Sequence, residues 1–251
     1  MKNFIFNRIW TYGFFALTIF TNLAAQDNST YSSVTQRTIE YARGHQEFKN
    51  LFFKEHEKEF VRLVEQGQFP KTLFIGCSDS RVIPELISAA RPGDLFVIRT
   101  AGNFVPYNDP TILWDGVAAS IQYAVEVLGV SDVIVCGHSH CGAIQGLFKD
   151  IQLKTLAQWL RFGHEAKRVT LQTLGKDASD EMKYNVAEHV SVISQLDHLL
   201  TYPYIKDKVE GQKLYLHGWH FSIETGVIEY FDPVTYKFIP LSGVLEKAAV
   251  K

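Results

Sequence analysis

Leu73-Phe74-Ile75-Gly76, followed by Cys77-Ser78-Asp79-Ser80-Arg81, is the stretch around which the chain is organised. The first four residues are apolar or small and predict a short buried strand. The next five place a thiol, a carboxylate and a guanidinium at alternate positions, which is unusual chemistry for a turn. The stretch therefore predicts a strand that delivers chemically active side chains at its carboxyl end.

A second polar cluster, His138-Ser139-His140-Cys141, follows a second apolar run, Val133-Ile134-Val135-Cys136. Sites in open α/β sheets form at the carboxyl ends of strands, so the two clusters are expected to meet. Zinc accepts thiolate and imidazole, and three protein ligands plus water is its catalytic arrangement. The paired CxxC knuckles of a structural zinc finger are absent from the sequence. The spacing alone leaves three interpretations open, namely catalytic zinc, a reactive cysteine, and unrelated turn residues.

The composition of the 251 residues predicts a folded α/β protein with a sizeable core. The apolar fraction is 46%, which argues against disorder. The formal net charge is −2 and no long basic run occurs, so nucleic acid is not an expected partner. Three cysteines in a chain of this length do not form a disulfide framework.

The N-terminus has the order basic, apolar, small that is typical of a secretory signal. Lys2 and Arg8 precede an uncharged run over residues 9–26, which ends in Leu23-Ala24-Ala25. We expect residues 1–25 to be a signal peptide, with export to the periplasm or secretion and no stable membrane span after processing. The alternative is an uncleaved N-terminal membrane anchor, since the run approaches the length that spans a bilayer.

Periodicity predicts alternating helices and strands after this segment. Residues 34–66 form an expected helical arm, in which Gly44 is a candidate break and whose aromatic residues suit docking on a partner subunit. Strands are expected over 71–76, 95–98, 133–136, 213–216 and 227–231. Helices are expected from 84, over 114–128, from 141, and over 153–200 with an interruption around Gly175. This order indicates an α/β fold for residues 26–251 as a single domain. Its central sheet is expected to be mainly parallel, with about four strands plus an antiparallel edge strand, and flanked by helices.

The two polar clusters together resemble the motifs of the β-class carbonic anhydrases. Further matches are Arg91-Pro92-Gly93-Asp94, Gln122-Tyr123-Ala124-Val125 and Leu216-His217-Gly218-Trp219, so the resemblance covers roughly residues 48–232. It implies a zinc lyase, a carbonate dehydratase that converts CO₂ reversibly to bicarbonate and a proton. It also implies a homodimer or larger homo-oligomer with the active site near the dimer interface.

The resemblance assigns roles to individual residues. Cys77, His138 and Cys141 match the ligands of one zinc ion per chain. Asp79 and Arg81 match a catalytic dyad in which the arginine holds the carboxylate away from zinc, whereas in a closed form Asp79 itself is a zinc ligand. The residues that match substrate-binding positions are Gln68, Phe96 and Tyr123, the last two supplied across a dimer interface.

The family chemistry is attack of zinc-bound hydroxide on CO₂. Two thiolates cancel the charge of the ion, so the bound water is expected to be less acidic than at a three-histidine site, and turnover is expected to rise above neutral pH. Phe74 and Phe221 stand where the closed, bicarbonate-regulated subset commonly has Trp and Tyr, which favours the open form. Gly76 is more typical of the regulated subset.

Other residues have simpler interpretations. Cys136 lies in an apolar strand and is expected in the core. His140 is a possible competitor of His138 as a ligand. His217 and His220 are three apart on a strand, face opposite sides and are poor co-ligands of one ion. His189 is expected at the surface or the edge of the core.

Two other functions remain compatible with the sequence. One is a hydrolase of a CO₂-like molecule such as carbon disulfide on the same scaffold. The other is a non-catalytic zinc-binding protein with Asp79 permanently bound to the ion.

Overall fold

The computed structural model describes residues 28–111 and 115–249. It divides into two compact units, Met1–Arg62 and Leu63–Lys251, which we describe separately. The expected signal peptide and Trp114 lie outside the described residues. Among the described residues, no helix has both the length and the apolar character needed to cross a membrane.

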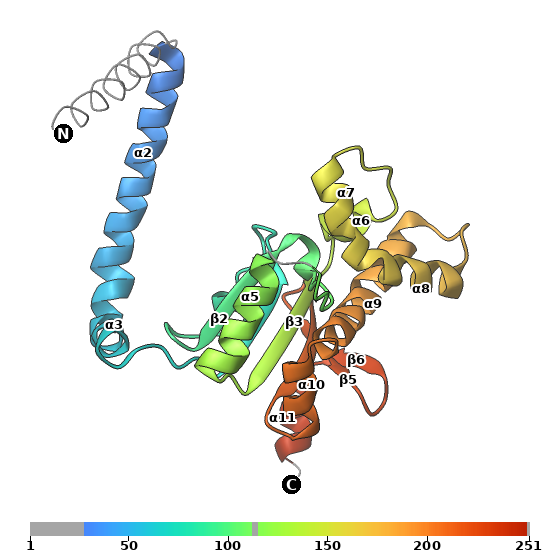
Figure 1. Ribbon diagram of the computed structural model, residues 1–251. Helices are drawn as coiled ribbons and strands as arrows, with labels where there is room; N and C mark the ends of the chain where they lie inside the picture. The colour runs from blue at the N-terminus through green and yellow to red at the C-terminus, as the bar shows by residue number, and fades with distance from the viewer. Residues whose placement is uncertain (1–27, 112–114, 250–251) are drawn as a thin grey trace, which may run out of the picture. The chain divides into compact units, whose positions relative to one another are not determined.

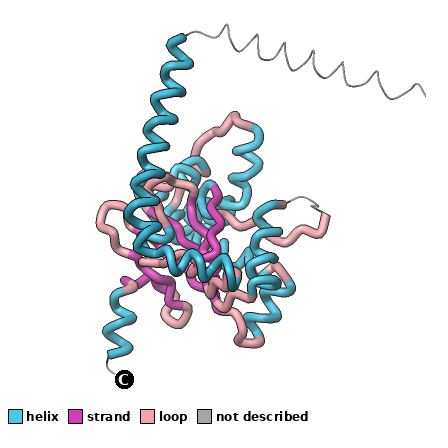
Figure 2. The backbone as a smooth tube through the Cα atoms, turned by 90° about the vertical axis from the view of Figure 1, so that its left-hand side faces the viewer, coloured by secondary structure: helices cyan, strands magenta, loops and turns pink. Residues whose placement is uncertain are grey.

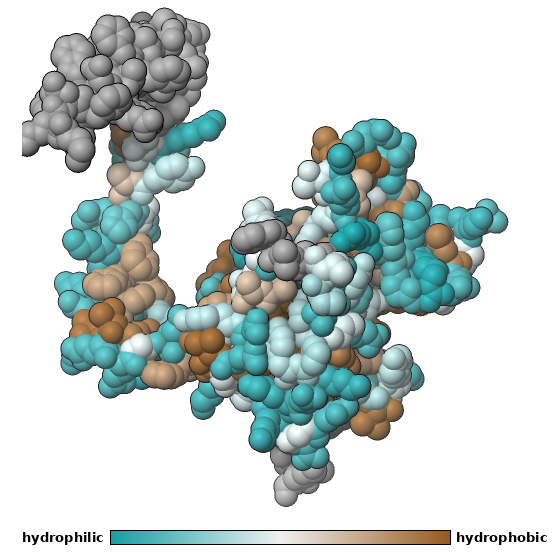
Figure 3. Space-filling view, in the orientation of Figure 1, coloured by the Kyte–Doolittle hydropathy of each residue, from teal (hydrophilic) through white to brown (hydrophobic). Residues whose placement is uncertain are grey.

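The first unit is a helical arm (Figure 1). Helix α2 (Asn28–Phe48) runs into the π-helical turn η1 (Lys49–Phe53) and then into α3 (Lys54–Gln66). The predicted break at Gly44 is wrong, since this residue lies inside α2 and the irregular turn comes five residues later. Space-filling colours show apolar side chains gathered at this turn (Figure 3). The exposed apolar residues there are Phe48, Leu51 and Phe52.

The second unit contains a six-stranded sheet with the order β2-β1-β3-β4-β5-β6. Strands β1 (Thr72–Cys77), β2 (Leu95–Thr100), β3 (Asp132–His138) and β4 (Tyr215–Phe221) are parallel. Strands β5 (Ile228–Asp232) and β6 (Lys237–Pro240) follow in antiparallel pairs. The mainly parallel sheet and its antiparallel edge are therefore confirmed. Strand β6 was not predicted, because its four residues are too few for a periodic pattern, and the fourth strand begins two residues later than expected.

Helices flank the sheet, as Figure 2 shows by colour. They are α4 (Pro84–Ile87), α5 (Gly116–Gln122) with its π-helical continuation η3 (Tyr123–Leu128), α6 (Gly142–Gly146), α7 (Lys154–Leu160), α8 (His164–Leu174), α9 (Asp180–Leu200), α10 (Pro203–Glu210) and α11 (Ser242–Ala249), with 3₁₀ turns η2 (Ala101–Asn103) and η4 (Arg161–Gly163). Asp115 caps α5 by accepting hydrogen bonds from the amides of Val117 and Ala118. Gly129, with φ of 70°, closes η3 in the left-handed conformation.

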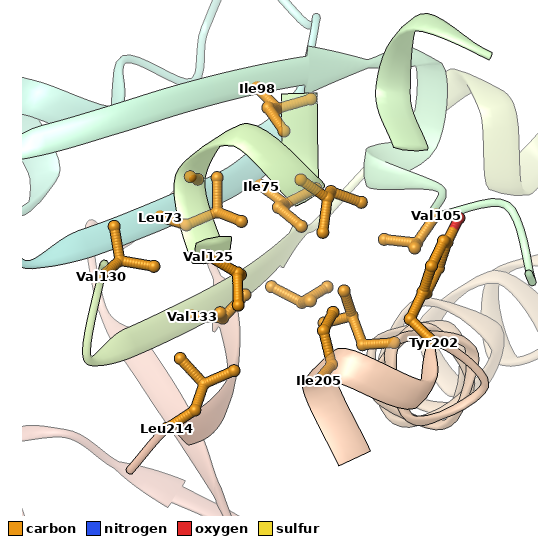
Figure 4. Packing of buried hydrophobic residues seen from close by; sticks show 14 of the residues in the cluster. Leu73, Ile75, Ile98, Val105, Val125, Val130, Val133, Tyr202, Ile205 and Leu214 are labelled. Atoms are coloured by element: carbon orange, nitrogen blue, oxygen red, sulfur yellow. The ribbon is translucent and has the colours of Figure 1, made fainter. Parts of the chain in front are cut away.

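The central strands are buried on both faces, which explains their unbroken apolar runs. Leu73 and Ile75 of β1 point into a core shared with α5, α9 and α10, shown in Figure 4. Phe74, between them, points to the opposite face and packs near Val82 and Cys136. The prediction that Cys136 is a core residue is confirmed, because its side chain is fully buried.

Two glycines let helix α9 approach the sheet closely. A Cβ at Gly137 of β3 would lie 2.7 Å from Cγ2 of Val192, and one at Gly218 of β4 would lie 2.9 Å from Cγ1 of the same residue. Real Cβ atoms essentially never make contacts this short. Glu188 lies one helical turn before Val192, so the close approach also carries its carboxylate to the carboxyl end of β3.

Candidate metal centre

Three buried side chains converge at the carboxyl ends of β1 and β3. The ligand atoms of Cys77, His138 and Cys141 all lie within 4.8 Å of one another. Cys77 is the last residue of β1 and His138 the last of β3, while Cys141 is the residue before α6. The exposed fractions of the three residues are 5%, 1% and 1%. The parallel pairing of β1 with β3 is what brings the two sequence clusters to the same edge.

His138 has the tautomer that a metal ligand needs. Its Nδ1 lies 2.8 Å from the carbonyl oxygen of Ser139, which can only accept, so this nitrogen carries the proton. Its Nε2 is buried and has no hydrogen-bond partner within residues 28–111 and 115–249. A buried polar atom without a partner is costly, and a metal ion would satisfy it. Two thiols and one imidazole nitrogen are a donor set for tetrahedral zinc with one position left open. The residues present therefore fit a zinc ion.

The two thiols are coupled to each other through a hydrogen bond. A hydrogen bond from Cys141 lowers the pKa of Cys77 to about 4, against the effect of burial. The pKa of Cys141 is raised well above its usual value, first by donating that hydrogen bond and then by burial. The backbone amide of Gly102 also donates to Cys77 Sγ over 3.3 Å. A divalent cation would supply the charge that allows both groups to be thiolates.

Asp79 is held by Arg81 rather than by the metal-competent group. Arg81 donates from Nε to Oδ1 over 2.9 Å and from Nη2 to Oδ2 over 2.8 Å, and its backbone amide donates to Oδ1 over 3.0 Å. The hydrogen bonds from the Arg81 side chain hold the pKa of Asp79 well below its usual range. Arg81 also donates to the carbonyl oxygen of His140 over 3.2 Å, which ties the first cluster to the second. His140 itself points to Glu224 and is absent from the metal-competent group.

Arg99 and Glu188 support the metal-competent residues and were not predicted from the sequence. Arg99 donates to the carbonyl oxygens of Cys77, Asp79 and Val82 over 2.9, 2.7 and 2.8 Å. Glu188, 3% exposed, accepts a 3.1 Å hydrogen bond from the backbone amide of Cys141. The sequence feature that could have revealed both residues is a charge inside an apolar pattern. Arg99 stands at the end of the apolar strand β2, and Glu188 stands within the apolar face of α9.

Comparison with known proteins identifies the family. Residues 72–228 match the family model described as carbonic anhydrase. The chain belongs to the β-class carbonic anhydrases. A carbonic anhydrase from Pseudomonas aeruginosa is 42% identical over 186 residues, which are 73% of this chain and 83% of that protein. Carbonic anhydrase 1 of Escherichia coli O157:H7 is 41% identical over 203 residues, or 80% and 90% of the two chains.

Solved structures agree with this assignment. The β-carbonic anhydrase CcaA superposes with a TM-score of 0.75 at 38% identity, covering 83% of this chain and 92% of that one. Tetrameric β-carbonic anhydrases of Sordaria macrospora give a TM-score of 0.67 at 29% identity, covering 77% and 96%. This carbonic anhydrase is accordingly an enzyme of the carbonate dehydratase class.

The residues that match substrate-binding positions lie apart from the metal-competent group. Phe96 and Tyr123 contact each other, with ring centroids 5.9 Å apart. Phe96 pairs in register with Leu73, which lies four residues before Cys77. About 13 Å of strand therefore separates Phe96 from Cys77 along the sheet. Gln68 is exposed in the segment between α3 and β1. Within one chain of this carbonic anhydrase, these three residues are not brought to Cys77.

An open groove lies beside the first cluster. Its volume is about 690 Å³, and Ser78, Arg99, Ala101 and Trp159 are among the lining residues. Trp159 is fixed by a 2.8 Å hydrogen bond from Nε1 to the carbonyl oxygen of Ala101. The groove gives access to the turn that follows Cys77, while Cys77 and Cys141 themselves belong to an apolar cluster with Phe104 and Ile144.

Proposed function

We propose that this chain hydrates CO₂ reversibly with a zinc ion held by Cys77, His138 and Cys141. The observation that carries the proposal is the buried, unpartnered Nε2 of His138 facing two buried cysteines. A zinc ion bound there would supply hydroxide by lowering the pKa of coordinated water. The other contributions come from the protein.

Asp79 and Arg81 are proposed to keep the fourth coordination position free. Both carboxylate oxygens of Asp79 accept hydrogen bonds from Arg81, and this pairing supports the open form over direct binding of Asp79 to the ion. The lowered pKa keeps the carboxylate ionised, so it acts only as a hydrogen-bond acceptor. Such an acceptor can orient a water or hydroxide by receiving its proton.

A second copy of the chain is proposed to complete the substrate pocket. The separation of Phe96 from Cys77 along the sheet supports supply of Phe96 and Tyr123 by a partner subunit. The exposed apolar turn of the helical arm, with Phe48, Leu51 and Phe52, supports the same view. We therefore propose a homodimer or larger homo-oligomer that binds CO₂ and bicarbonate, with Gln68 as the polar group for substrate.

Export of the protein remains part of the proposal. It rests on the basic, apolar and small order of residues 1–25. Fractionation of cells that express the full chain, with mass determination of the mature N-terminus, tests it. Full-length protein in the membrane fraction would indicate the anchored alternative instead.

Stopped-flow measurement of CO₂ hydration on the purified protein tests the main proposal. We expect activity that a strong chelator removes and added zinc restores. Zinc-loaded protein without activity at alkaline pH would refute the proposal and favour a closed, non-catalytic zinc protein. A protein that is inactive on CO₂ and hydrolyses carbon disulfide would instead establish the second alternative.

A further inference from the structure

A second group of metal-competent side chains is formed by residues of α9, β4 and β5. The group consists of His189 from α9, His220 from β4 and Glu229 from β5, and its ligand atoms all lie within 4.8 Å of one another. Glu229 Oε2 lies 3.1 Å from His189 Nε2 and 3.7 Å from His220 Nδ1. Two ligands of a tetrahedral zinc ion lie about 3.3 Å apart. The separations are therefore close to those that one ion requires.

The burial of His220 is not explained by the pairing of His189 with Glu229. Its side chain is 4% exposed, and among the described residues neither ring nitrogen has a hydrogen-bond partner. His189 Nε2 and Glu229 Oε2 lie 3.1 Å apart, and the ring of His220 is stacked against that of His189 with ring centroids 3.9 Å apart. A buried imidazole with two unsatisfied nitrogens is costly to the fold unless something binds it.

The surroundings of the two rings favour the ligand tautomers. His189 Nδ1 lies 2.8 Å from the carbonyl oxygen of Asn185, so this nitrogen carries the proton and Nε2 presents its lone pair to the group. His220 Nε2 faces Glu188 Oε2 at 3.6 Å, while its Nδ1 faces Glu229. Histidine ligands of metals ordinarily direct their other nitrogen to a carbonyl or carboxylate in this way. Burial also lowers the pKa of His220, which favours the neutral ring.

We propose that His189, His220 and Glu229 bind a second divalent metal ion, separate from the Cys77 site. Two imidazoles and one carboxylate suit zinc or a similar late first-row ion. The side chains of His189 and Glu229 are 23% and 34% exposed, which gives the ion a route from solvent and room for a water ligand.

Glu188 connects this second site to the first. One carboxylate oxygen faces His220 and the other accepts the backbone amide of Cys141. An ion at the second site fixes His220, and His220 in turn fixes the carboxylate that supports the Cys141 turn. The second ion thus has a structural role close to the zinc ligands without sharing any of them.

Metal stoichiometry tests the proposal independently of catalysis. Purified full-length protein is dialysed against excess Zn²⁺, and bound metal per chain is measured by elemental analysis. We expect about two ions per chain in the wild type and about one in His189→Gln and Glu229→Gln. Both changes are at partly exposed positions and nearly isosteric, so folding is expected to survive and is checked by circular dichroism. His217→Gln is the matched control, since His217 also lies on β4 beside a carboxylate, Asp132 at 2.8 Å, and belongs to neither metal-competent group of the described residues.

Cobalt substitution distinguishes the two sites by their ligands. The Cys77 site should give intense sulfur-to-cobalt charge-transfer absorption, whereas the second equivalent should add only weak d–d bands because it has no thiolate. A wild type that binds one ion, or a second equivalent that His189→Gln and Glu229→Gln leave unchanged, would overturn the proposal. Neither result would affect the proposed CO₂ hydration, which depends on the first site.

Discussion

Substitution of Arg99 by Met should weaken both the fold and the metal centre. Methionine keeps the apolar stem and removes the guanidinium, which bonds three carbonyl oxygens of the 77–82 turn at 2.7–2.9 Å. Two of these bonds, to Cys77 and Val82, are partly buried. Water therefore replaces them incompletely when the donor is lost.

The expected size follows from these three bonds. A typical hydrogen bond contributes about 0.5–1.5 kcal/mol net, so the loss of three should cost about 1.5–4.5 kcal/mol in the free energy of unfolding. The carbonyls of Cys77 and Asp79 would also lose their common anchor. Groups that orient metal ligands contribute about 10–100-fold to metal affinity, and we expect a decrease in zinc affinity of that order.

Urea unfolding followed by circular dichroism measures the first effect, and competition with a chromophoric chelator measures the second. Arg168→Met is the control, because Arg168 pairs only locally with Glu165 and Gln172 on the surface of α8. Its effect should be too small to resolve. If Arg99→Met costs no more than Arg168→Met in stability and metal affinity, Arg99 does not support the centre and the reasoning fails.

Three further predictions concern the cysteines, the dyad and pH. Cys77→Ser should lose most bound zinc while Cys136→Ser retains it, because Cys136 lies in the core; equal losses by elemental analysis would contradict the ligand assignment. Arg81→Ala should retain zinc but lose most CO₂ hydration, because Asp79 would be free to bind the ion; unchanged activity would show that the pairing is dispensable. The turnover number should rise with pH above neutral, because two thiolates reduce the charge that acidifies bound water; a pH–rate profile that falls from neutral to mildly alkaline pH would contradict this.

The sequence was sufficient to predict the sheet because its signals are local. Unbroken apolar runs such as Leu73–Ile75 require a strand covered on both faces, and parallel strands carry their following polar residues to one edge. Two buried strands therefore predicted that Cys77 and Cys141 would meet. Strand β6 was not predictable because it has only four residues, and two of them are Lys237 and Pro240. It is held in the sheet by pairing with β5.

The contacts of Glu188 and His220 were not predictable in the same way, because they depend on residues far apart in the chain. Glu188 and Cys141 are 47 positions apart in the chain, and their hydrogen bond exists because glycines at 137 and 218 admit Val192 to the sheet surface. No periodic pattern encodes such a contact. His220 is comparable, because alternation along β4 correctly separated it from His217 but did not reveal that α9 would bring His189 against it.

The two polar clusters are joined by direct hydrogen bonds as well as by the ion that they are proposed to share. Arg81 bonds Asp79 within its own cluster and the carbonyl oxygen of His140 in the other. His140 has a left-handed backbone, with φ of 56°, and its ring contacts Glu224, which also accepts a 2.7 Å hydrogen bond from Ser139. A non-glycine residue keeps this conformation only where its neighbours hold it. Release of Asp79 from Arg81 would therefore also loosen an anchor of the turn that carries Cys141, so opening or closing of the site is expected to involve both turns together.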